Sequence, residues 1–156
     1  MIIISIKRIE SASRTRESVF VDSGAWIALI KRDDRLHDDA RQYYDKLYAA
    51  RAGLLTTNYI VAETATRLRY DAGLQAALDF RTRIDALHRV GRGRTIWIDE
   101  RLEAQGWLIM AQYADIPLSL TDATSAAVAR VNRITDVFGF DKHFAALGFV
   151  VAPSLS

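Results

Sequence analysis

The segment SVFVDSGAWIALI, residues Ser18–Ile30, decides the fold. Its β-branched and aromatic residues 19–21 predict a short buried strand. Asp22 follows at once, and the apolar residues after it recur at a spacing that predicts a helix over 23–32. A carboxylate at such a junction is costly unless it caps a helix, pairs with a cation or binds a metal.

The same alternation of strand and helix continues along the chain. Four-residue to seven-residue apolar segments bounded by turn residues predict further strands at 54–57, 95–99, 116–122, 136–140 and 148–152. Helical periodicity predicts helices at 35–53, 59–73, 74–91, 100–115, 123–134 and 141–147. This order predicts a three-layer α/β/α fold with a mainly parallel central sheet of about five strands.

Length and composition exclude several classes of protein. The chain has 156 residues, half of them hydrophobic, which predicts one ordered domain. The absence of cysteine excludes a disulfide scaffold, a thiolate metal site and a cysteine nucleophile. No apolar run approaches the roughly 20 residues that cross a bilayer, so we expect no membrane association and a cytoplasmic location.

Residues 1–18 differ from the rest of the chain. Their polar, aperiodic sequence predicts a flexible leader, either a tag or an upstream extension. The leader carries four basic and two acidic side chains, which accounts for the whole net charge of +2. The domain proper, predicted at 19–152 with a tail at 153–156, is therefore neutral, and overall charge says little about its partners.

Four acidic residues follow predicted strands. Asp22, Asp122 and Asp141 lie directly at strand ends, and Glu63 lies six residues after the strand at 54–57. Because ligands of parallel sheets bind at the carboxyl ends of the strands, these side chains are expected to meet in one crevice. The alternative is that the three aspartates are helix caps or first-turn acids and that Glu63 is a solvated helix residue.

Clustered acids without cationic partners raise one another's pKa values, and a divalent cation removes that cost. Oxygen ligands without cysteine favour a hard ion, Mg²⁺ or Mn²⁺. The three histidines match no metal-binding spacing, so surface or packing roles are expected for His37, His88 and His143. His143 is the one of interest, because it lies two residues after Asp141.

Four segments, VFVDSGAWIAL, TTNYIVAETATRL, PLSLTDATSAAVA and VFGFDKHFAALGF, resemble the acidic motifs of the PIN-domain superfamily in their usual order. The last two most resemble the VapC-type toxins of toxin–antitoxin pairs, and the similarity spans about residues 19–152. Carried over by position, the acids of the family are Asp22, Glu63, Asp122 and Asp141.

The resemblance implies an endoribonuclease that uses Mg²⁺ or Mn²⁺ to hydrolyse RNA phosphodiester bonds and leaves a 5′-phosphate. It implies that Asp22, Asp122 and Asp141 hold the ion and that Glu63 completes the site. It also implies a homodimer and a cognate antitoxin that inserts a basic residue among the acids.

Two positions bear on the details of this site. Gly139 stands where many members have Thr or Ser, so no hydroxyl is available there. Ser23 follows the first acid and either contributes a hydroxyl to the site or caps the helix.

RNA also requires cations to contact its phosphates. The candidates are Arg67, Arg69, Arg92 and Arg94. Solvated helix faces with intrachain ion pairs, such as Arg81 with Asp85, are the alternative for the arginine-rich region. The three tryptophans lie in apolar patterns and are expected in the core: Trp26, Trp97 and Trp107.

Other functions remain open at this point. A non-catalytic α/β binding module could use the acids as caps or as a regulatory metal site, and a PIN-like DNA nuclease would use the same acids on another substrate. A receiver domain needs a late functional lysine, for which Lys142 is poorly placed. A dehalogenase-like phosphatase needs a second aspartate where the chain has Gly24.

Overall fold

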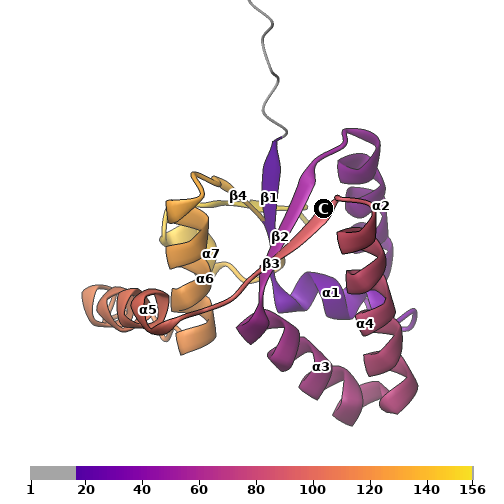
Figure 1. Ribbon diagram of the computed structural model, residues 1–156, viewed down its shortest axis with the longest axis horizontal. Helices are drawn as coiled ribbons and strands as arrows, with labels where there is room; N and C mark the ends of the chain where they lie inside the picture. Colours follow the sequence, from indigo (N-terminus) through magenta and orange to yellow (C-terminus); the bar gives the residue numbers. More distant parts are fainter. Residues whose placement is uncertain (1–16, 156) are drawn as a thin grey trace, which may run out of the picture.

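A parallel five-stranded sheet forms the centre of the protein in a computed structural model that describes residues 17–155. Figure 1 shows α2 and α4 on one side of the sheet and α5 and α6 on the other, which confirms the α/β/α prediction. The strands are β1 Ser18–Val21, β2 Gly53–Thr57, β3 Gly93–Ile96, β4 Asp136–Phe138 and β5 Val150–Ala152. The helices are α1 Ser23–Ile30, α2 His37–Ala49, α3 Asn58–Ala72, α4 Leu74–Arg89, α5 Glu100–Gln112, α6 Leu120–Val131 and α7 His143–Ala146.

The order of the strands places a crevice beside β1. The sheet runs β3-β2-β1-β4-β5 with every pair parallel. The chain therefore builds outward from β1 to β3, returns across the sheet through α5 and α6, and continues outward on the other side from β4. Such a reversal of direction is where ligands of open α/β sheets bind, and here it lies between β1 and β4.

Residues on both faces of β1 are buried, which explains why its sequence is continuously apolar. Phe20 and Val21 are fully buried. In the same core, the Trp26 ring of α1 packs against the Phe80 ring of α4 with ring centroids 5.7 Å apart. The start of α3 is fixed by Thr57, whose Oγ1 accepts a hydrogen bond from the backbone N–H of Ile60 at 3.1 Å, as expected for a cap.

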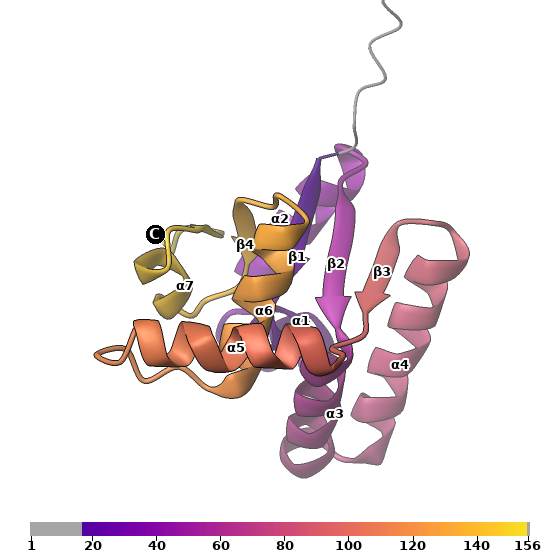
Figure 2. The ribbon, with the colours of Figure 1, turned by 60° about the vertical axis from the view of Figure 1, so that its left-hand side comes forward.

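The pair of helices α5 and α6 packs closely because of one small residue. A Cβ added to Gly106 of α5 would lie 2.6 Å from Thr124 Cγ2 of α6, so only glycine fits at this contact. Figure 2 shows α5 crossing in front of α6.

The strand predicted at 116–122 is wrong. Residues 116–119 form a loop, and α6 begins at Leu120. The physical reason is a capping box between Ser119 and Asp122, which starts a helix at the point where an apolar run indicated a strand.

All three tryptophans were predicted in the core, but two of them are exposed. Trp26 is 1% exposed, but Trp97 is 75% and Trp107 54% exposed. Trp97 lies in the segment just after β3, and α5 directs Gly106 and Ile109, rather than Trp107, to its buried face.

The predicted leader at 1–18 lies outside the described residues except for Glu17 and Ser18, and Ser18 already belongs to β1. Within the described part of the chain, no helix is long and apolar enough to cross a membrane.

Candidate functional site

Asp22 follows β1 directly and lies next to the end of β4. Its backbone N–H donates to the carbonyl of Phe138 at 2.9 Å, which joins the ends of the two strands. Its side chain is 5% exposed, and Oδ1 has no hydrogen-bond partner among the described residues. A buried polar atom without a partner is rare in folded proteins and calls for a functional explanation.

The surroundings of Asp22 raise its pKa from the ordinary value of 3.8 to about 7. Burial is the main cause, and the carboxylates of Asp122, Glu63 and Asp141 add to it. A backbone hydrogen bond from Ser23 acts in the opposite direction. Since these three acids are distant from it in sequence, the fold brings them near enough to act on the charge of Asp22, and among the described residues the atoms close enough to share an ion belong to Asp122, Asp141 and His143.

Asp122 occupies the first turn of α6 and serves both as a cap and as a member of the acidic cluster. Its Oδ2 accepts from the backbone N–H of Ser119 at 2.9 Å, and its own N–H donates to Ser119 Oγ at 3.0 Å. The two proposed roles of this aspartate are therefore compatible, because the capping bond occupies one carboxylate oxygen and orients the other.

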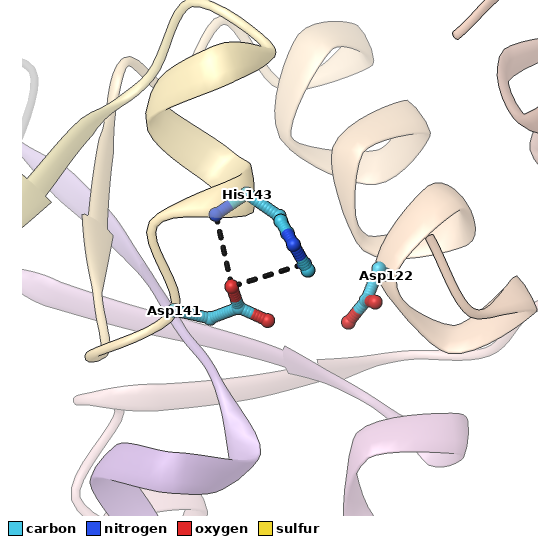
Figure 3. Close-up of side chains that lie close together, drawn as sticks. All are labelled: Asp122, Asp141 and His143. Atoms are coloured by element: carbon cyan, nitrogen blue, oxygen red, sulfur yellow. Dashed lines mark hydrogen bonds and ion pairs between the residues drawn. The ribbon is translucent and has the colours of Figure 1, made fainter. Parts of the chain in front are cut away.

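Asp141 lies between β4 and α7, and its side chain lies near that of Asp122 (Figure 3). Its Oδ1 accepts from the backbone N–H of His143 at 2.9 Å, and the same oxygen lies 3.2 Å from Nδ1 of the His143 ring. One atom each from Asp122, Asp141 and His143 lie within 4.8 Å of one another. Sequence reasoning expected a surface or packing role for His143 and singled it out only for its closeness to Asp141, because the direction of its ring cannot be predicted without the turn geometry.

Glu63 borders the cluster from α3 and lines a groove beside it. The groove has a volume of about 460 Å³, and Arg67, one turn further along α3, lines it too. The other residues that line it were not predicted: Tyr59, Ala62, Thr66 and Thr121. Tyr59 OH donates to Glu103 Oε2 at 2.6 Å, which links α3 to α5 and raises the pKa of the tyrosine.

The other arginine candidates do not line this groove. Arg92 donates to the carbonyl oxygens of Tyr48 and Ala52 and stacks on the Tyr48 ring at 4.3 Å, an arrangement that favours a structural role at the end of α2. Arg94 donates to Asn132 Oδ1 at 3.2 Å. Arg69 is exposed on α3.

Two small residues shape the space around Asp22. Ser23 is 5% exposed and is the first residue of α1, directly after Asp22. A Cβ added to Gly139 would lie 3.1 Å from Asp22 Cβ. The glycine therefore allows the backbone just after β4 to lie close to the acid. A hydroxyl residue at this position would crowd Asp22.

The residues present fit a hard divalent ion. The donors are carboxylate oxygens with one imidazole beside them. Within the described part of the chain, none of the four acids forms an ion pair with a Lys or Arg side chain. A bound cation would neutralise the mutual repulsion and give Asp22 Oδ1 the partner that it lacks among the described residues.

The fold and site together define a parallel α/β/α protein with a carboxylate cluster at the point where the strand order reverses. The model of the PIN domain family matches residues 19–150. The chain belongs to the PIN-domain family, as its motifs predicted.

Individual relatives agree with this assignment. The chain is 32% identical over 134 residues to the 23S rRNA-specific endonuclease VapC20 of Mycobacterium tuberculosis, covering 85% of this chain and 95% of that protein. The crystal structure of that organism's VapC20, described as a sarcin–ricin loop cleaving toxin, matches with a TM-score of 0.73 at 31% identity, covering 85% of this chain and 96% of the other. VapBC2 from Rickettsia felis matches with a TM-score of 0.64 at 9% identity, covering 86% and 97%, which shows the shared fold alone.

Proposed function

We propose that this protein is an endoribonuclease that uses Mg²⁺ or Mn²⁺ to hydrolyse RNA phosphodiester bonds and acts as the toxin of a toxin–antitoxin pair. The observation that carries the proposal is the convergence of Glu63, Asp122 and Asp141 on Asp22, whose buried Oδ1 has no hydrogen-bond partner among the described residues. The similarity of this chain to a named ribosomal RNA endonuclease, over most of both chains, supports the choice of RNA over DNA as substrate.

Each acid has a distinct role in this proposal. Asp22, Asp122 and Asp141 hold the ion, and hydrogen bonds from backbone amides orient the last two. The ion supplies Lewis-acid chemistry, which activates water and offsets negative charge on the phosphate. Glu63 lies at the rim, where its carboxylate would complete the site or orient the attacking water by accepting a hydrogen bond from it.

The groove beside Glu63 is the proposed path of the RNA. Arg67 lines it at one helical turn from the acid and is placed to contact a phosphate next to the scissile one. Because VapC20 is named for action on 23S rRNA and on the sarcin–ricin loop, the corresponding loop of large-subunit RNA is the proposed substrate.

The proposal includes three further expectations from the family. A cognate antitoxin inserts an Arg or Lys among the acids, since a basic side chain satisfies clustered carboxylates without a metal. The protein forms a homodimer, and it acts in the cytoplasm, where its RNA substrate is found.

The test is to map RNA ends in cells that express the wild type or Asp122→Asn. The wild type is expected to produce new 5′-phosphate ends in large-subunit RNA, and the variant, which lacks one charged ligand of the ion, is expected to produce none. Asp45→Asn is a matched control, because it removes an exposed carboxylate that pairs with Arg41 on α2.

A wild type that produces no new ends would favour a binding module over an enzyme. Identical new ends from Asp122→Asn would place the chemistry at another site or in another protein. New ends from DNA rather than RNA would support a PIN-like DNA nuclease instead.

A further inference from the structure

His143 lies against the acidic cluster, although its spacing in the sequence matches no metal-binding motif. It is the first residue of α7, and its backbone N–H and ring Nδ1 both face Oδ1 of Asp141, at 2.9 and 3.2 Å. Its side chain is 30% exposed, so the ring is partly enclosed rather than free in solvent. Figure 3 shows the ring directed into the space between Asp141 and Asp122.

The spacing of the donor atoms suits a shared ion. One atom from each of Asp122, Asp141 and His143 lie within 4.8 Å of one another. Two atoms that bind one ion at about 2.2 Å lie no more than about 4.4 Å apart, so small side-chain rotations bring all three to bonding distance.

An independent observation indicates that a ligand belongs at this place. Asp22 is 5% exposed, and its Oδ1 has no hydrogen-bond partner among the described residues. Asp22 lies beside the same cluster, because its backbone N–H donates to the carbonyl of Phe138 at 2.9 Å, three residues before Asp141. A cation between these groups would supply the missing partner.

We propose that His143 contributes a ring nitrogen to the ion held by Asp122 and Asp141, and that this nitrogen makes the site prefer Mn²⁺ to Mg²⁺. The inference rests on the proposed function, since it concerns the same metal site. Mg²⁺ strongly favours oxygen ligands, whereas first-row transition ions accept imidazole, so one nitrogen among carboxylates shifts the preference toward Mn²⁺.

The experiment uses the full chain without an affinity tag, so that the three native histidines are the only imidazoles. Pulsed electron paramagnetic resonance of the Mn²⁺-loaded protein detects nitrogen coupled directly to the ion. We expect a coordinated imidazole signal in the wild type and its loss in His143→Asp, which replaces nitrogen by oxygen. His88→Gln is the matched control, because His88 lies in α4 and hydrogen-bonds Thr95 Oγ1 at 3.0 Å.

Calorimetric titration gives the second measurement. We expect His143→Ala to weaken Mn²⁺ binding by about tenfold or more, the range in which partners of a metal site act. Mg²⁺ binding by the same variant should change much less, so the ratio of the two affinities moves toward Mg²⁺.

The outcomes separate this inference from the function on which it rests. Mn²⁺ binding that depends on Asp122 but shows no imidazole coupling would overturn the role of His143 and leave the metal site in place. A nitrogen signal that persists in His143→Asp would also overturn it. Failure of the wild type to bind Mn²⁺ would contradict the proposed function itself.

Discussion

Replacing Asp22 with Asn is expected to make the metal-free protein more stable above neutral pH. The wild type must hold a charged carboxylate that is 5% exposed, close to other acids and without a partner for Oδ1 among the described residues. Asparagine keeps the shape of the side chain and removes the charge. Residues that bind a cation commonly destabilise the protein when the cation is absent, and this substitution isolates that effect.

The magnitude follows from the pKa of Asp22. In the unfolded chain the carboxyl loses its proton near 3.8, whereas in the folded protein it keeps the proton up to about 7. Between these pH values the folded state binds more protons than the unfolded state, so stability falls as pH rises and levels off above about 7. At about 1.4 kcal/mol per pH unit, the loss is about 4 kcal/mol, a large part of the stability of a small domain.

The assay is urea unfolding in EDTA, followed by tryptophan fluorescence, at a series of pH values from about 4 to 8.5, the range that spans both pKa values. Asp22→Asn should lack the decline seen in the wild type and should exceed it in stability by up to about 4 kcal/mol at the upper end. Asp45→Asn, which removes an exposed carboxylate, should stay within about 1 kcal/mol of the wild type. If the free energy of unfolding changed with pH in the same way in the wild type and in Asp22→Asn, the reasoning would be refuted.

Three further predictions concern the metal, the helix packing and the RNA groove. Mn²⁺ affinity should rise about tenfold per pH unit up to about 7 and then level off, because the ion displaces the proton of Asp22. Calorimetric titration at a series of pH values, in two buffers, checks this, and an affinity that does not change with pH would contradict it. Gly106→Ala should cost about 1–3 kcal/mol in urea unfolding, because the added Cβ would lie 2.6 Å from Thr124 Cγ2, and unchanged stability would mean looser packing. Arg67→Ala should raise KM for RNA and reduce the salt slope of binding by about one. Arg69→Ala, on the same helix but outside the groove, should do neither, and equal effects of the two variants would remove the groove from the account.

Periodicity and strand ends made most of the site predictable. Continuous apolar strands are typical of a sheet covered on both faces, and their alternation with helices predicts parallel pairing, so Asp22 and Asp141 were expected at the same edge of the sheet; that their strands are neighbours is seen only in the structure. Asp122 reached the site for a different reason from the one predicted. It begins a helix through its bonds with Ser119 rather than ending a strand, and the Ser-x-x-Asp spacing was the signal that the apolar run obscured.

Side-chain placement was less predictable, because it depends on which face of an element packs. Trp97 and Trp107 lie in apolar sequence but are exposed, since the buried contacts of α5 are made by Gly106 and Ile109. Arg92 and Arg67 look equivalent in sequence. Only the path of the chain brings Arg92 to the carbonyl oxygens at the end of α2 and Arg67 to the groove.

The most direct test of the central claim is the single-turnover rate of RNA cleavage by purified wild type and Asp22→Asn in Mg²⁺ or Mn²⁺, on an RNA that contains the sarcin–ricin loop. The unfolding experiment shows independently whether the variant is folded, so a lost rate cannot be attributed to misfolding. The account predicts a fall greater than the roughly 100-fold that loss of an outer partner of a metal site can cause. Undiminished, metal-dependent cleavage by Asp22→Asn would contradict it.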